Sequence, residues 1–95
     1  MNLPATEIES YLRSELARIT GEDAESYNSE TVLIGRDRVL DSADLVIFLL
    51  AVEDFAAEQL GVRWDWTSDS AMSDTRSVLR TLGSLAAHLA SLQPA

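Results

Sequence analysis

The sequence predicts an all-α protein, a four-helix bundle with three longer helices, one short helix and a long loop between the first two. Apolar residues recur at helical spacing over residues 4–19, 41–60 and 82–92. Hydrophobic residues make up 46% of the chain, but only 2 Trp, 2 Tyr and 2 Phe are present, which favours a helical bundle over a sandwich. A chain of 95 residues suffices for one domain with a modest core. We expect a single domain over residues 1–95, with its core over about 4–92.

The first predicted helix covers residues 4–19. Pro4 and Thr6 fit a helix start, and Gly21 follows as a stop signal. Its predicted buried stripe contains Ile8, Leu12, Leu16 and Ile19. Residues 21–40 show no long period, so we expect a loop that its own side chains hold against the core. The side chains expected to do so are Tyr27, Val32, Leu33, Ile34 and Val39.

The central predicted helix, over residues 41–60, is the longest in the chain. Asp41 or Ser42 fits its N-cap, Asp44 suits its first turn, and Gly61 fits its end. Apolar residues at steps of three and four predict its core face: Leu45, Leu49, Val52, Ala56 and Leu60. A second apolar set lies off this stripe. Because so short a chain cannot bury a helix on every side, we expect this set to meet a partner protein: Ala43, Val46, Ile47 and Leu50.

The C-terminal third is predicted to contain two further helices. Residues 62–66 are expected to form an extended connection with at least one tryptophan on the core, and residues 69–73 a short helical turn. The last helix covers 82–92, with Thr81 as its cap. Its predicted core residues are Leu82, Leu85, Leu89 and Leu92.

Composition excludes several classes of function. The chain has no cysteine and a single histidine, which excludes disulfides and thiolate metal sites. Its net charge of −9, with arginine as the only basic residue besides His88, argues against nucleic acid and favours partners with basic surfaces. No apolar run reaches membrane-spanning length, and no signal peptide is recognisable. We therefore expect a cytoplasmic monomer with no membrane partner.

The run from Val39 to Phe55 resembles the acyl carrier protein family around its Asp-Ser-Leu motif. The resemblance is to the free-standing type and extends from the first helix to about Leu92, in the same order of elements. It implies that Ser42, preceded by Asp41, carries 4′-phosphopantetheine, which a phosphopantetheinyl transferase takes from coenzyme A. The terminal thiol of that arm would carry acyl groups as thioesters, so the chain would be a carrier and not itself an enzyme. A phosphodiester at a helix N-terminus is electrostatically favourable.

The resemblance also implies which proteins the chain meets. They are the transferase, an acyl or aminoacyl ligase or acyltransferase, and a ketosynthase or other pathway enzymes. The expected docking residues follow the serine along the helix: Ala43, Val46, Ile47, Leu50, Glu53 and Asp54. The chain departs from the family pattern in three places: Ala43 replaces a leucine, Ile47 stands where many members have an acid, and residues 56–60 lengthen the helix. These departures bear on which partners the chain shares with ordinary fatty-acid carriers. The longer connection over 72–80 favours a dedicated fatty-acid, polyketide-type or other secondary-metabolite pathway.

Two alternatives stay open. One is an aminoacyl or peptidyl carrier loaded by a stand-alone adenylating ligase, and the other is an unmodified helical adaptor that docks a partner through Ala43, Val46, Ile47 and Leu50. For Ser42 taken alone, the simpler interpretation is that it is only an N-cap. A second Asp-Ser pair, Asp69-Ser70, shows that the dipeptide alone is weak evidence. No sustained helical period follows that second pair, whereas about five turns of helix follow Ser42.

Other site chemistry finds little support in the sequence. No serine has the strained turn that a Ser–His–Asp hydrolase needs, and His88 lies among leucines on the last helix, where packing explains it. The spacing of Asp65, Thr67 and Asp69 resembles a calcium loop, but Ser70 and Arg76 occupy the glycine and acid positions. We expect neither a catalytic residue nor a metal site.

Overall fold

Three α-helices make up most of the structure, a computed structural model that describes residues 3–64 and 78–93. They are α1 (Ala5–Thr20), α2 (Ser42–Phe55) and α4 (Leu82–Leu92), with a short 3-10 helix, η1 (Ala24–Ser26), and a π-helix, η2 (Ala56–Leu60). Within the described ranges no strand forms, and the one bridge joins Val32 and Thr81. The all-α prediction is confirmed. The short helix predicted over 69–73 lies outside the described residues, as does Trp66.

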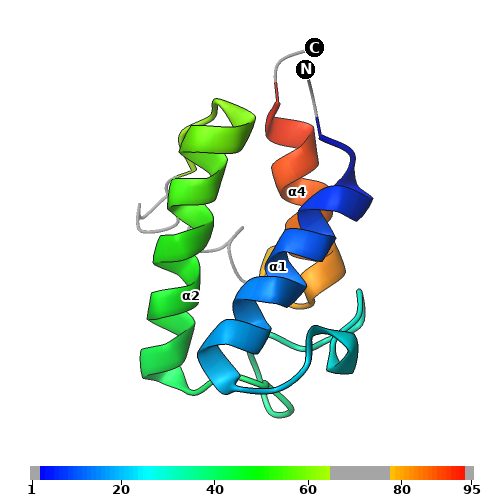
Figure 1. The fold of residues 1–95 in the computed structure, drawn as a ribbon, viewed down its shortest axis with the longest axis vertical. Helices are drawn as coiled ribbons and strands as arrows, with labels where there is room; N and C mark the ends of the chain where they lie inside the picture. Colours follow the sequence, from blue (N-terminus) through cyan, green and yellow to red (C-terminus); the bar gives the residue numbers. More distant parts are fainter. Residues whose placement is uncertain (1–2, 65–77, 94–95) are drawn as a thin grey trace.

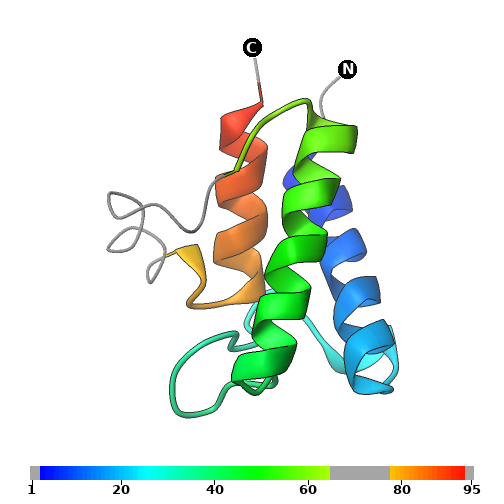
Figure 2. The same cartoon turned by 90° about the vertical axis from the view of Figure 1, so that its left-hand side faces the viewer.

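The helix α1 runs antiparallel to both α2 and α4. Figure 1 shows α2 to one side with α4 behind α1, and Figure 2, turned by 90°, shows α2 in front of the other two helices and the connection between α1 and α2 crossing one end of the bundle. One buried apolar cluster joins all three helices to that connection. The two ends of the described chain meet, since the Gln93 side chain accepts a hydrogen bond from the Leu3 N–H (2.7 Å) and donates one to the Leu3 carbonyl (2.8 Å).

Most of the stripe of apolar residues predicted for α1 is buried. Ile8, Leu12 and Leu16 are fully buried, whereas Ile19 is only partly buried against the core. Pro4 is the N-cap, although no side chain caps this end. The helix ends as predicted at Gly21, whose N–H donates to the Ala17 carbonyl at 2.8 Å.

The central helix extends to Leu60 as predicted, but its last turn is not α-helical. The α-helix ends at Phe55, and residues 56–60 form the π-helix η2, which ends at Gly61 with φ 67°. A π-turn closes i→i+5 hydrogen bonds instead of i→i+4, so later residues are rotated back around the axis. This rotation leaves Leu60 buried at 6% exposure. Phe48 and Phe55 are buried beside Leu49 and Val52, while Leu45 is only partly buried.

The loop before α2 is fixed by backbone hydrogen bonds to the start of α4. The N–H groups of Leu82 and Gly83 donate to the carbonyls of Thr31 (2.9 Å) and Ser29 (2.8 Å). Thr81 caps α4 as predicted, in a capping box with Ser84, because each side chain accepts from the other residue's N–H. The loop therefore reaches α2 from a defined place on the core.

Burial within the loop agrees with the prediction at three positions, since Tyr27 and Leu33 are buried and Ile34 packs partly against the core. Val32 is only partly buried and does not join the core cluster, and Val39 is 39% exposed, while Leu40 is buried instead. On α4 the expected core residues are buried except one: Leu92, in the last turn, is 37% exposed. Of the helices that the structure describes, none has the length and apolar character needed to cross a bilayer.

Candidate functional site

Ser42 is the first residue of α2, and its hydroxyl is exposed. Asp41, not Ser42, is the N-cap: its carboxylate accepts a hydrogen bond from the Asp44 N–H at 2.8 Å, and its backbone carbonyl accepts from the Leu45 N–H at 2.8 Å. Among the residues that the structure describes, no group is hydrogen-bonded to the Ser42 hydroxyl. The idea that Ser42 serves only as the N-cap is therefore wrong.

Buried residues on both sides hold this serine in place. Leu40 is 1% exposed, immediately before the cap, and Leu45 packs partly against the core one turn into the helix. These are the N′ and N4 positions of a hydrophobic staple, which fixes the angle at which a chain enters a helix. The Val39 N–H donates to the Val32 carbonyl at 3.1 Å and closes the loop just before it. Ser42 is thus an exposed residue between a buried and a partly buried leucine.

Charged groups of both signs lie near Ser42 in the sequence: the carboxylates of Asp41 and Asp44 disfavour a further negative group, whereas the N-terminal end of the helix favours one. The first N–H groups of a helix have no intrahelical partner and form the positive end of the helix dipole. The preceding loop contributes two exposed arginines, Arg36 and Arg38, in a chain whose net charge is −9. An exposed hydroxyl in this setting can be esterified, and the phosphate of such an ester would lie by unpaired N–H donors.

The outer face of α2 is apolar and open to solvent. Val46, Ile47 and Leu50 are 45%, 48% and 49% exposed, and Ala43 next to the serine is exposed as well. The opposite side of the same turns carries the core, so the two predicted faces of this helix are confirmed. Further along, Asp54 is exposed and Glu53 is partly buried. The structure brings these six residues and Ser42 onto one helix, whereas their role in partner binding stays a prediction.

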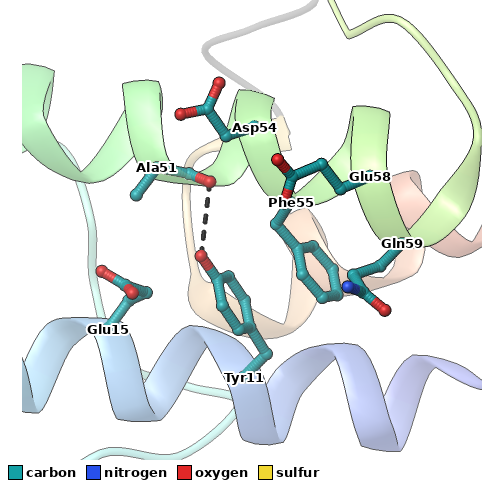
Figure 3. A pocket seen from close by; sticks show the side chains of 7 residues that line it. All are labelled: Tyr11, Glu15, Ala51, Asp54, Phe55, Glu58 and Gln59. Carbon is teal, nitrogen blue, oxygen red and sulfur yellow. Dashed lines mark hydrogen bonds between the residues drawn. The ribbon is translucent and has the colours of Figure 1, made fainter.

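A hollow between α1 and the far half of α2 was not predicted from the sequence. It has a volume of about 290 Å³ and is shown in Figure 3. Tyr11 of α1 stacks on Phe55 of α2, with 3.9 Å between ring centroids and 9° between ring planes. Around this pair lie the remaining lining residues, which are Glu15, Ala51, Asp54, Glu58 and Gln59.

The phenol of Tyr11 is held at the inner side of this hollow. Its hydroxyl donates a long hydrogen bond of 3.3 Å to the Ala51 carbonyl, drawn in Figure 3. Burial, reinforced by the nearby Glu15 carboxylate, raises the pKa of Tyr11 from 10.0 to about 12. Tyr11 is therefore a neutral donor at physiological pH.

The hollow and Ser42 are separate features of the molecule. Asp54 lies 12 residues after Ser42 on the same helical run, which corresponds to about 18 Å along the axis. His88 lies on α4, and within residues 3–64 and 78–93 no group of three His, Cys, Asp or Glu residues forms a candidate metal site. Neither the Asp69-Ser70 pair nor the calcium-like run falls within the described residues.

Comparisons with protein-family models, with curated proteins and with solved structures found no match to this chain.

Proposed function

We propose that the chain is an acyl carrier protein, modified on Ser42 by 4′-phosphopantetheine and serving a dedicated biosynthetic pathway. The observation that carries the proposal is the geometry at Ser42. Its hydroxyl is exposed and without a described hydrogen-bond partner, while Asp41 performs the capping. The proposal also rests on the resemblance of residues 39–55 to the family motif, and includes the predicted four-helix arrangement with a short helix over residues 69–73.

A carrier needs a reachable attachment point and a surface for its enzymes, and supplies no catalytic groups of its own. Ser42 protrudes at one end of the exposed apolar face of α2, so a docked enzyme would cover Ala43, Val46, Ile47 and Leu50 together with the arm. Half-exposed apolar side chains of this size lose contact with water only when a partner covers them. The bound enzyme would then receive the arm directly, and its own active site would supply the chemistry.

The proposal is tested by the mass of the protein after co-expression with broad-specificity phosphopantetheinyl transferases. Wild type should gain the mass of one phosphopantetheine group. The Ser42→Ala variant should gain nothing while keeping the wild-type circular dichroism spectrum, because the Ser42 hydroxyl makes no described hydrogen bond within the fold. An unchanged mass of wild type with every transferase would refute the carrier proposal.

The partner face is tested separately, by loading of the modified protein by its own ligase or acyltransferase. Ile47→Glu should stay folded, because Ile47 is 48% exposed, and should still be modified on Ser42, yet it should be loaded poorly. Asp54→Arg should mainly slow association at low salt, because an exposed acid steers encounter with a basic patch and salt screens this effect. A folded Ile47→Glu protein that is loaded at the wild-type rate would remove Ile47 from the interface.

The exposed apolar face also favours a second candidate function, an unmodified helical adaptor. In that case Val46, Ile47 and Leu50 would bind a partner protein, and Ser42 would take no part. The mass measurement separates the two functions. Within the carrier proposal, fatty or polyketide acyl groups are the first candidates for the cargo, and an amino acid loaded by a stand-alone adenylating ligase is the alternative.

A further inference from the structure

The loop before Ser42 is paired with the start of α4 through the two backbones. Val32 and Thr81 form an antiparallel bridge. Beside this bridge the Leu82 N–H donates a hydrogen bond to the Thr31 carbonyl at 2.9 Å. Figure 2 shows that α2 and α4 begin toward the same end of the bundle, where the loop crosses. The loop is therefore tied to α4 near the point where α2 begins.

Gly83 makes the closest approach in this pairing. Its N–H donates to the Ser29 carbonyl at 2.8 Å. A Cβ on residue 83 would stand 2.8 Å from that same oxygen and 2.9 Å from the Ser29 Cβ, closer than Cβ atoms pack in proteins. These atoms belong to the loop backbone or are bonded directly to it, so they cannot turn away as the end of a long side chain can. Any side chain at position 83 would displace the loop from α4.

Val32 connects this pairing to the residues next to Ser42. Its carbonyl accepts a hydrogen bond from the Val39 N–H at 3.1 Å, so Val32 is joined to α4 on one side and to Val39 on the other. The two residues between Val39 and Ser42 are also held, because Leu40 is 1% exposed and Asp41 caps α2. A displacement of the paired loop is therefore transmitted to the serine, since no free residue lies between them to absorb it.

We propose that Gly83 is a positioning residue for Ser42, which acts through the backbone of the paired loop. The inference rests on the proposed function, because attachment of phosphopantetheine to Ser42 is the reaction that it concerns. The exposed face of α2 that would dock the transferase takes no part in the pairing, so a side chain at position 83 should alter the catalytic step more than binding. Misplacement of a reacting group by about 1 Å can lower a rate by about 10²-fold.

The test compares kcat and KM for transfer of phosphopantetheine to wild type and to Gly83→Ala, at a temperature where circular dichroism shows both to be folded. The value of kcat should fall by about tenfold, and KM should change by about twofold at most. Gly61→Ala is the matched control, the same chemical change at the far end of η2 from Ser42. Its backbone has φ 67° and no atom lies within 4 Å of an added Cβ, so it loses stability through strain alone and should keep the wild-type kcat. An unchanged kcat in Gly83→Ala, or an equal fall in both variants, would overturn the inference.

Amide hydrogen exchange of the unmodified protein tests the same connection without any transferase, and in wild type it needs no variant that folds. The N–H groups of Val39, Leu82 and Gly83 should be protected to a similar degree, because they belong to one hydrogen-bonded unit. Protection of the Val39 N–H should fall by about tenfold more in Gly83→Ala than in Gly61→Ala. A Val39 N–H that exchanges freely in wild type would overturn the inference. A wild type that no transferase modifies would instead refute the carrier proposal, and the exchange data would still decide whether Gly83 positions Ser42.

Discussion

The two faces of α2 predict opposite effects for two chemically similar substitutions. Leu49 is 4% exposed and Ile47 is 48% exposed, and each loses three carbon atoms on mutation to alanine. For Leu49→Ala, three buried carbons at about 0.8 kcal/mol each give about 2.4 kcal/mol, and the cavity left behind raises the loss to about 3 kcal/mol. The Ile47 side chain is only about half buried, so the same three carbons contribute about 1.2 kcal/mol to stability. Alanine has a higher helix propensity than isoleucine, which offsets about 0.4 kcal/mol of this loss and leaves about 0.8 kcal/mol.

Urea unfolding followed by circular dichroism measures this difference. A chain of 95 residues has about 5–14 kcal/mol of stability, so both variants should remain folded without denaturant. The free energies of unfolding should differ by about 2 kcal/mol, or about 2 M in midpoint for an m-value near 1 kcal/mol per M. Equal losses in the two variants would show that Ile47 packs in the core, and would remove the basis for a partner face on α2.

Three further predictions concern the cap, the loop and the buried phenol. Asp41→Ala should lower stability by about 1 kcal/mol in thermal unfolding, because it removes the N-cap of α2, whereas Ser42→Ala should change it by less than about 0.5 kcal/mol; the reverse order would make Ser42 the cap. Gly83→Ala should cost about 1–3 kcal/mol, because a Cβ there would stand 2.8 Å from the Ser29 carbonyl oxygen, and a neutral effect would show that the loop is not held against α4. Since folding raises the pKa of Tyr11 from 10.0 to about 12, the neutral phenol contributes stability that is intact below pH 10 and is lost as pH rises toward 12. The denaturant midpoint should therefore fall more steeply between pH 10 and 12 in wild type than in Tyr11→Phe. Parallel pH profiles of the two proteins would show that the Tyr11 hydroxyl is not buried.

The helical period was sufficient to predict the helices and the exposure of α2. It placed Leu49 and Val52 on the core and Ile47 on the outside, because a single stripe of apolar residues is all that a small bundle can bury from one helix. Cap residues located the ends equally well: Thr81 caps α4, and Gly21 ends α1. These features depend on residues close together in the sequence, so the pattern within one segment is enough to predict them.

Features that depend on how two elements pack against each other could not be predicted from the sequence. The step of four from Ala56 to Leu60 predicts an α-helix, and nothing in the local sequence indicates that residues 56–60 form a π-helix with Leu60 buried. The pairing of Tyr11 with Phe55, and hence the hollow, depends on the rotation of α1 against α2, which no period within one helix determines. Partner binding by the outer face remains a prediction for the same reason, because it depends on a second molecule.

Attachment of the phosphopantetheine arm to Ser42 can be located by fragment-ion mass spectrometry of the modified chain. After incubation with coenzyme A and a broad-specificity transferase, the protein is digested, and the peptide with the added mass is fragmented to locate the group. The whole added mass should lie on Ser42, and a Ser70→Ala variant should be modified to the same extent as wild type. Addition at Ser70, or an unmodified Ser42 peptide under conditions that modify a known carrier, would contradict this assignment.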